Sequence, residues 1–423
     1  MLDKNLFLYD LAVVAILKNE GLYLKEWLDY HLLAGVEHFY LYDNDSTDNQ
    51  AEIVKPYVEA GLVDYFFLPG KVMQVFAYND AINRFKFLCR YMAFIDLDEF
   101  IYPKNTTGTI TETVDDILSD NPTAAGLSIH WQLFGSNGQK KADYSRGVLE
   151  RFIRRAEKDF GHFENKNNSP CAYGNIFLKL IANPRRIKKM LIHYAIYFKI
   201  FHTVNEKGIK LPETQVTLPI CAEKIVINHY FNKSREEAEL KIARGRAGSA
   251  QKWPSNKINL YDRNEVFDDG ILKYRAVRAD NFSLADNEQR LNRVKTALIK
   301  TLSRFSDGEI SDLETALTCQ ALSHYFLEKF PDDKRFKIFE EASLAAILSS
   351  LDRLKIFEIR LLIRELPNFL ILPYPIVTEL KHAVLKIISQ MMQFDREDKF
   401  TEEFEDFNHT NLDFLRRLLE VWR

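Results

Sequence analysis

The sequence predicts an α/β fold: a mostly parallel central sheet flanked by helices, followed by an all-α C-terminal domain. Strand and helix patterns alternate over the first 135 residues, which is typical of right-handed βαβ units. The continuous apolar run Leu11–Leu17 is typical of a parallel strand buried on both faces. From about residue 285 onward strand patterns nearly vanish and leucine-rich helical periodicity recurs, which indicates a separate helical domain.

The first third of the chain is predicted to be a series of strand–helix units. Leu24, Leu28 and Leu32 repeat at helical spacing, and Gly35 ends that helix. Ligands of such sheets bind at the carboxyl ends of the strands, and polar clusters follow several of the predicted strands. The expected elements are strands at 11–17, 38–42, 63–68, 91–95 and 125–134, and helices from about 24, at 49–60 and at 74–89.

The middle of the chain has a mixed pattern. The polar stretch 157–174 is predicted to be a long loop, a length at which loops are often functional or mobile. Residues 225–230 form an apolar run of strand length. Ser234 and Glu237 match a capping box, so a basic helix is expected to begin there.

We expect three parts along the chain. They are an α/β domain at 1–250, a connecting segment at 251–284 and a helical accessory domain at 285–423 that packs on the α/β domain or mediates assembly. In the helical part, the apolar segment 369–375 either packs in the interior or touches a membrane surface, and both uses stay open. Helical windows recur at about 286–303, 309–329, 335–348, 351–365, 374–394 and 400–421.

Composition is that of an ordinary globular protein and narrows the expected partners. Hydrophobic residues make up 46% of the 423 residues and charged residues 28%, which excludes wholesale disorder. The net charge is −3, so we expect no nucleic-acid partner, and any anionic ligand needs a local basic cluster. Four scattered cysteines without a CxxC pair argue against a disulfide framework and against thiolate zinc. The run Leu11–Leu17 is too short to span a membrane and no signal-peptide pattern follows it, so a cytoplasmic location is expected.

The strongest chemical motif is the carboxylate pair Asp96 and Asp98 at the end of a buried strand. Residues two apart in a strand share one sheet face, where both carboxylates could hold a hard divalent cation. Apolar residues flank the pair on both sides, so leaving its charge uncompensated would cost several kcal/mol. A metal ion or a basic partner is therefore expected there.

A second pair, Asp43 and Asp45, follows the predicted strand at 38–42. It lies in the run 43–48, which is rich in Asn, Ser and Thr and directly precedes a helix. Turn and N-cap chemistry explains such a run as well as ligand binding does. Both interpretations stay open for this pair.

An ordered set of motifs resembles the glycosyltransferase family 2 and family 92 group. The resemblance covers residues 11–250, is specific as an ordered set, and leaves the helical last third uncovered. It implies a GT-A fold and an enzyme that uses a nucleotide sugar. The motifs are Val14–Glu20, Glu26–Trp27, His31–Gly35, Tyr42–Asp48, Asp96–Phe100, Trp131, Phe134–Gly138, Glu150–Phe152 and Asn228–Phe231.

The resemblance implies roles for particular residues. The nucleoside of the donor, expected to be a UDP-sugar, would lie between the ends of the first two strands. Asp96 and Asp98 would bind Mn²⁺ or Mg²⁺ at the diphosphate, where the ion offsets charge on the leaving group. His229, at the end of an apolar strand, is the expected third metal ligand, because imidazole suits Mn²⁺. The expected donor contacts are Lys18, Asn19, Glu20, Asp43, Asp45, Asn79 and Asp96.

The catalytic base is expected after the Gly135–Gly138 loop, where an acceptor could lie. Transfer with inversion, which the resemblance implies, needs a carboxylate that takes the proton of the acceptor hydroxyl. Glu150 is the first candidate because it lies in a matching motif, and Asp143 is the second. Glu99 is a poor candidate, because in a strand its side chain would face away from Asp98.

The expected function is therefore metal-dependent transfer of a sugar to a glycan or lipid-linked acceptor, in polysaccharide or lipopolysaccharide synthesis. Two alternatives stay open. A sugar nucleotidyltransferase usually needs a glycine-rich loop after the first strand, whereas Lys18–Glu20 is followed here by one glycine, Gly21. A non-catalytic helical adaptor with a degenerate α/β half conflicts with the intact Asp96–Asp98 pair. Peripheral contact with the inner membrane face and a homo-oligomer through the helical domain complete the expected partners.

Overall fold

The computed structural model describes residues 2–105, 107–166, 169–245, 256–281 and 287–351. It contains two compact units. One is Tyr9–Asn287, and the other joins the described residues among the first eight to those from Glu288 onward. The helical windows predicted beyond 351, and the segment 369–375, lie outside the described residues.

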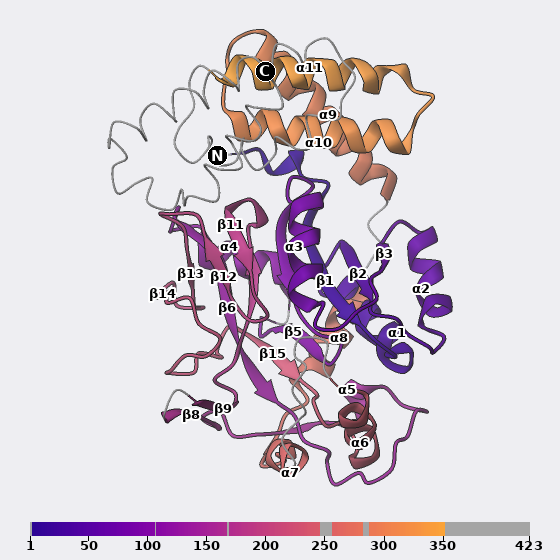
Figure 1. Ribbon diagram of the computed structural model, residues 1–423, viewed down its shortest axis with the longest axis vertical. Helices are drawn as coiled ribbons and strands as arrows, with labels where there is room; N and C mark the ends of the chain where they lie inside the picture. Colours follow the sequence, from indigo (N-terminus) through magenta and orange to yellow (C-terminus); the bar gives the residue numbers. More distant parts are fainter. Residues whose placement is uncertain (1, 106, 167–168, 246–255, 282–286, 352–423) are drawn as a thin grey trace. The chain divides into compact units, whose positions relative to one another are not determined.

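The first unit is built around a mixed sheet (Figure 1). The strands are β1 (Tyr9–Leu17), β2 (His38–Asp43), β3 (Val63–Phe67), β4 (Cys89–Phe94), β5 (Glu99–Pro103), β6 (Ala124–Leu133), β10 (Leu178–Ala182), β13 (His202–Val204), β14 (Lys210–Leu211) and β15 (Ile225–His229). Their order is β14-β13-β6-β10-β4-β1-β2-β3, and β15 pairs with both β5 and β6. The pairs β4–β1, β1–β2 and β2–β3 are parallel, whereas β10 runs antiparallel between β4 and β6.

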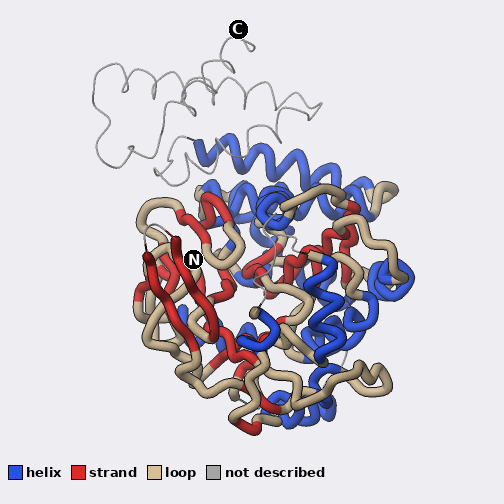
Figure 2. The backbone as a smooth tube through the Cα atoms, turned by 60° about the horizontal axis from the view of Figure 1, so that its bottom comes forward, coloured by secondary structure: helices blue, strands red, loops and turns tan. Residues whose placement is uncertain are grey.

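Helices alternate with the strands and pack against them (Figure 2). Among these contacts, α1 lies against β5, α2 against β3 and α3 against β1. The helices of this unit are α1 (Gly21–Leu33), α2 (Gln50–Glu59), α3 (Gln74–Phe85), α4 (Ile110–Leu118), α5 (Val148–Arg151), α6 (Arg235–Arg244), α7 (Lys257–Tyr261), α8 (Gly270–Asn281) and the short η2 (Pro184–Arg186). Smaller two-stranded sheets pair β7 (Arg154–Arg155) with β16 (Val266–Phe267), β8 (Gly161–Lys166) with β9 (Ser169–Gly174), and β11 (Ile187–Met190) with β12 (Ala195–Tyr197).

The predicted strand–helix series of the first third is confirmed. In β1 almost every residue is buried, which is why its sequence is continuously apolar rather than alternating. Leu17 at the end of β1 pairs in register with Asp43 at the end of β2. The polar residues that follow these two strands are therefore brought to one edge of the sheet.

Two predictions about local structure are wrong. The stretch 157–174, expected as a loop, contains the antiparallel hairpin of β8 and β9, whose polar sequence lacks the apolar alternation of a half-buried strand. The chain also does not stay extended through Asp96 and Asp98, because β4 ends at Phe94 and a turn leads into β5 at Glu99. The antiparallel strand β10 was not predicted from the sequence.

The first unit extends past the expected boundary at 250. Helix α8 belongs to it: Arg278 Nε donates to the carbonyl of Leu33, and Tyr274 OH donates to the carbonyl of Gly108, both at 3.1 Å. Tyr274 is fully buried in the core of the unit. Residues 270–281, which were expected to belong to a connecting segment, are therefore part of the first unit.

The described residues of the second unit are helical. It contains η1 (Lys4–Leu6), α9 (Asn287–Ser306), α10 (Leu313–Lys329) and α11 (Lys334–Ser350). Helices α10 and α11 pack through buried rings, and the Phe326 and Phe336 centroids lie 5.2 Å apart. In neither unit does a described helix have the length and apolar character needed to cross a membrane.

Candidate active site

The turn Asp96–Glu99 joins β4 to β5 at the carboxyl edge of the parallel strands. The backbone N–H of Glu99 donates to the carbonyl of Asp96 at 3.1 Å, and Glu99 Oε2 accepts from the N–H of Asp96 at 2.9 Å. Because this segment is a turn, strand alternation does not decide where its side chains point. Asp96 and Asp98 therefore meet different partners, and Glu99 shares its partner Lys179 with Asp96.

Asp96 is held by groups of the protein itself. Its Oδ2 lies 2.9 Å from Lys179 Nζ, and its Oδ1 accepts from Gln74 Nε2 at 2.7 Å. Lys179 lies on β10, is fully buried, and also lies 3.3 Å from Glu99. Burial alone would lower the pKa of Lys179, but the carboxylates of Asp96 and Glu99 outweigh it and raise that pKa above its ordinary value. Burial raises the pKa of Glu99 to about 8.

Asp98 meets a second set of groups, from β15 and α6. Its Oδ2 lies 3.2 Å from His229 Nε2 and contacts the ammonium of Lys241. Burial would raise the pKa of Asp98, but Lys241 and His229 together hold it well below its usual range. The Asp98 carboxylate is consequently charged and paired at neutral pH.

The resemblance implies a divalent cation, so the spacing and chemistry of these side chains are compared with those of metal ligands. Two ligands at about 2.1–2.2 Å from one ion lie about 3 Å apart when they are adjacent around it, and Asp98 Oδ2 and His229 Nε2 have this spacing. Their chemistry, one carboxylate and one imidazole, suits Mn²⁺. Asp96 is turned toward Lys179, and no group of three acidic, histidine or cysteine side chains is placed to hold a metal within the described residues. Asp98 and His229 thus fit the ion, and Lys241 would have to give way.

The end of β1 is joined to α6. Arg244 Nη1 donates to the carbonyl of Asn19 at 2.8 Å, and its Nη2 contacts Glu20 Oε1. Asn19 has a left-handed φ of 52°, and its side-chain oxygen accepts from the N–H of Thr47 at 2.7 Å. The carboxyl end of β1, the acidic turn after β2 and the basic end of α6 are therefore adjacent.

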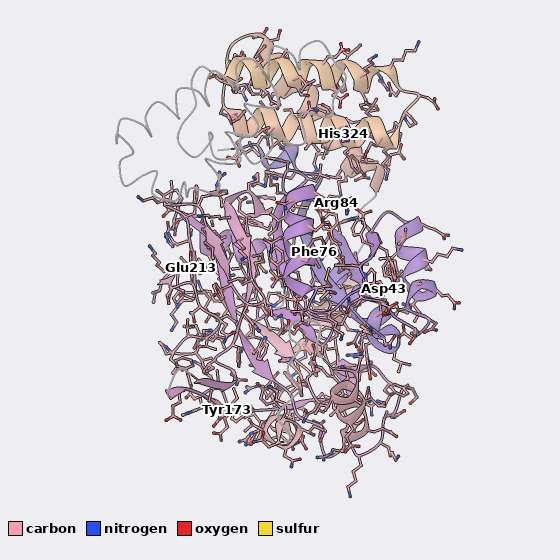
Figure 3. The ribbon with its side chains drawn as sticks, viewed as in Figure 1. Asp43, Phe76, Arg84, Tyr173, Glu213 and His324 are labelled. Atoms are coloured by element: carbon pink, nitrogen blue, oxygen red, sulfur yellow. The ribbon has the colours of Figure 1, made fainter. Side chains whose placement is uncertain are left out.

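The acidic turn after β2 contains two carboxylates with different surroundings. Asp43 (labelled in Figure 3) is buried and accepts at Oδ1 from the N–H of Ser46 and from Gln50 Nε2, both at 3.0 Å. Asp45 is exposed and has a φ of 61°. Asp48 of the same turn accepts from the N–H of Gly21 at 2.8 Å, at the start of α1. Turn chemistry is thus present, and Asp45 also remains accessible to a ligand.

Two other predicted donor contacts have different settings. Lys18 is partly exposed, directly after β1. Asn79 Nδ2 donates to the carbonyls of Val75 and Met190, and its Oδ1 accepts from the N–H of Met190 at 2.9 Å. The Asn79 amide thereby ties α3 to β11, which uses both of its N–H groups and leaves one acceptor site on Oδ1 for a nucleotide.

The two candidate bases contact groups other than the aspartate pair. Glu150 Oε1 is 3.7 Å from Arg275, and Asp143 is exposed and accepts from Ser145 Oγ at 2.6 Å. The contacts of these two carboxylates join neither of them to Asp96 or Asp98. The structure brings together the ends of β1, β2 and β4 with β15 and α6, and the two predicted bases make their contacts with Arg275 and Ser145.

Sequence reasoning missed Lys179 and Gln74. A signal for Lys179 existed, because it is the one charged residue in the apolar run Ile176–Ala182. A lone lysine in a buried strand needs a carboxylate partner. Gln74 carries no comparable signal, since a polar residue at the start of a helix is ordinary.

Comparisons with known proteins agree with the resemblance. The family model "Glycosyltransferase family 92" matches residues 14–262. A glycosyltransferase family 92 protein of Ricinus communis is 25% identical over 263 residues, or 61% of this chain and 42% of the relative. One from Oryza sativa subsp. japonica is 28% identical over 227 residues, or 52% of this chain and 33% of the relative. The chain thus spans less than half the length of these relatives.

Shorter or weaker likenesses also occur. Galactan beta-1,4-galactosyltransferase GALS2 of Arabidopsis thaliana is 33% identical over 89 residues, 19% of this chain and 17% of that protein. The crystal structure of S. aureus TarS 1-349 in complex with UDP-GlcNAc covers 92% of each chain at 13% identity with a TM-score of 0.32, which is too low to support a conclusion. The family model, by contrast, matches more than half of the 423 residues. The matched residues include Asp98 and His229. The chain belongs to glycosyltransferase family 92.

Proposed function

We propose that this protein transfers a sugar from a nucleotide sugar, with UDP as the leaving group, to a glycan or lipid-linked acceptor with inversion. One observation carries the proposal: in a family 92 chain, Asp98 and His229 meet at the sheet edge to which the ends of β1 and β2 also come. That edge is where ligands of parallel sheets bind.

The donor would lie across the ends of the first strands. Lys18, Asn19 and Glu20 follow β1, and the exposed Asp45 follows β2. A carboxylate such as Asp45 can accept from ribose hydroxyls or from the N–H of uracil. Arg244 reaches Asn19 and Glu20 from α6, so a guanidinium is available where the diphosphate would begin. The remaining predicted contacts, Asp43 and Asn79, stay proposals.

Asp98 and His229 would hold the Mn²⁺ or Mg²⁺ ion, and Asp96 is proposed to join them when its bond to Lys179 opens. When bound, the ion would supply the positive charge that stabilises the departing diphosphate. Lys241 contacts Asp98. Its ammonium would therefore be close enough to pair with the negative charge that develops on the departing diphosphate. Lys179 keeps Asp96 ionised from the buried side of the turn.

Glu150 remains the proposed base and Asp143 its alternative, although neither contacts the aspartate pair. An acceptor held between Glu150 and the sheet edge would have to bring its hydroxyl to one of these carboxylates. Similarity to the galactosyltransferase GALS2 makes UDP-galactose the first donor to try and β-1,4-galactan the first acceptor. Action at the inner membrane face, a cytoplasmic location and self-association through the helical unit stay predictions.

The test is a panel of UDP-sugars incubated with the full chain and Mn²⁺, Mg²⁺ or EDTA, with release of UDP and sugar measured separately. Hydrolysis of a nucleotide sugar that Asp98→Asn abolishes is the expected result. Formation of a nucleotide sugar from a nucleoside triphosphate and a sugar phosphate would instead identify a nucleotidyltransferase. Neither reaction, together with no thermal stabilisation by UDP, would favour the non-catalytic adaptor.

A further inference from the structure

A cavity of about 420 Å³ lies beside the proposed donor site, between α1, the segment leading into α5, and α8. This volume is in the range of small-ligand sites. Tyr23 lines the cavity, and its ring lies 4.1 Å from Nζ of Lys233, whose ammonium interacts electrostatically with Glu20 and Asp98 of the proposed donor site. Its hydroxyl donates to Glu237 at 2.9 Å, one helical turn before Lys241 on α6. The cavity therefore adjoins the donor site without being part of it.

The carboxylate of Glu26 lines the cavity and is held by backbone N–H groups. Glu26 accepts from the N–H of Val148 at 2.5 Å and from the N–H of Leu149 at 3.3 Å. A Cβ at Gly147 would lie 2.1 Å from Glu26 Oε1, so only glycine allows this close approach. Glu26 is held in place by the backbone, while its side chain keeps 19% of its surface exposed. The family resemblance includes Glu26, yet the donor site does not use it.

Acidic, basic and aromatic side chains all line the cavity. Arg275 lies 3.7 Å from both Glu26 and Glu150, so one guanidinium faces two carboxylates. Tyr144 and Leu22 at the lining are 49% and 67% exposed, so an aromatic face and an aliphatic side chain are accessible to a ligand there. Arg151 also lines the cavity and is fully buried, and its Nε has no hydrogen-bond partner within the described residues.

The charges of the lining select the class of ligand. Arg151 is neutralised by Glu237, with which it forms two hydrogen bonds at 2.8 and 2.9 Å. The other charged side chains balance, three basic against three acidic: Lys25, Arg146, Arg275, Glu26, Asp29 and Glu150. A balanced lining attracts neither anions nor cations, whereas carboxylates, guanidinium groups and exposed tyrosine faces suit the hydroxyls and C–H faces of a neutral sugar.

We propose that this cavity binds neutral sugar units of the acceptor glycan, away from the unit that reacts; this inference rests on the proposed function. Glu26 accepts from sugar hydroxyls, Arg275 donates to ring or hydroxyl oxygens, and Tyr144 stacks on a sugar face, while Glu150, the proposed base, is left for the hydroxyl that reacts. Because Tyr23 and Glu237 separate the cavity from Asp98, the bound units are those further along the acceptor chain. The cavity thus sets preference for acceptor length rather than for the donor.

The test measures binding of the full chain to a panel of defined oligosaccharides, without donor. The panel contains β-1,4-galactan, cello-, xylo- and manno-oligosaccharides of two to six units, and oligogalacturonides as the anionic arm. The variants are Tyr144→Ala and Arg275→Ala. Arg304→Ala is the control, because Arg304 has similar exposure and also pairs with a glutamate, 3.1 Å away, in the helical unit. Hydrolysis of UDP-galactose and thermal stabilisation by UDP are measured in the same preparations.

The expected result is that a neutral oligosaccharide binds more tightly with increasing length, and that each cavity variant weakens the longer ligands roughly tenfold. Arg304→Ala should bind as the wild type does, and UDP-galactose hydrolysis should be equal in the wild type, Tyr144→Ala and Arg304→Ala. Binding that both cavity variants leave unchanged, binding of the anionic arm alone, or no binding by a hydrolytically active wild type would each overturn the inference. If the protein neither hydrolyses UDP-galactose nor binds UDP, but still binds oligosaccharides, the proposed function is wrong and the cavity assignment stands.

Discussion

The ammonium of Lys179 lies 2.9 Å from Oδ2 of Asp96, although 83 positions separate them in the sequence. The contact exists because β10 pairs antiparallel with β4, with Leu180 opposite Phe94. The first aspartate of the motif is thus joined to a fully buried cation, whereas the second, Asp98, meets His229 and the less deeply buried side chain of Lys241. The two aspartates therefore have different roles in stability and, we expect, in chemistry.

Lys179→Met is expected to lower the free energy of unfolding by about 3 kcal/mol, because it leaves Asp96 and Glu99 without their buried cation. Urea unfolding of the full chain, followed by fluorescence, measures this change. Lys189→Met is the control: Lys189 is exposed on β11, and its replacement should change stability by less than about 0.5 kcal/mol. Equal stability of the two variants would show that the buried ion pair contributes nothing.

Asp98→Asn is expected to reduce transfer about a thousandfold, which corresponds to about 4 kcal/mol in the transition state. From the sequence alone, removing one charge of an acidic pair would relieve repulsion. In the structure Asp98 is paired with Lys241 and His229, so a small fall in melting temperature is expected instead. Transfer rate and melting temperature are compared with Asp116→Asn, an exposed aspartate on α4. Near-normal metal-supported turnover in Asp98→Asn would remove Asp98 from the site.

His229→Ala should weaken turnover supported by Mn²⁺ more than turnover supported by Mg²⁺, because Mn²⁺ gains more from a nitrogen ligand. The measurement is activity against the concentration of each ion, with His229→Gln as a second variant that better fills the buried space. If both variants keep the wild-type dependence on Mn²⁺, His229 serves to orient Asp98 and packs against Trp131, whose ring centroid is 4.2 Å away.

The Glu237–Arg151 pair predicts loss of stability in acid. Burial would raise the pKa of Glu237, but hydrogen bonds from Arg151 and Ser234 outweigh it and lower that pKa from 4.5 to about 2. A depressed pKa stabilises the folded state above pH 4.5, and this contribution, up to about 3 kcal/mol, is lost as pH falls toward 2. Urea unfolding between pH 5 and pH 2 should therefore depend less on pH in Glu237→Gln than in the wild type. Parallel curves for both would contradict the low pKa.

Much of the fold could be predicted because its signals are local. The buried run of β1, the helical spacing of Leu24 and Leu28, and the capping box of Ser234 and Glu237 each depend on residues a few positions apart. The hairpin of β8 and β9 was missed because its polar residues do not alternate with apolar ones. Strand β10 has an apolar sequence, but its direction is set by pairing with β4 and β6, which no local pattern reports.

The sequence by itself determined the βαβ order, the family and the aspartate motif, since each is written in adjacent or regularly spaced residues. Only the tertiary structure decided that Lys179 binds Asp96, that Lys241 and His229 meet at Asp98, and that Glu150 faces Arg275 in a separate cavity. These contacts join residues that lie 83 to 143 positions apart in the sequence. Such pairings follow from strand order and helix packing, where burial and charge balance over the whole unit determine which side chains meet.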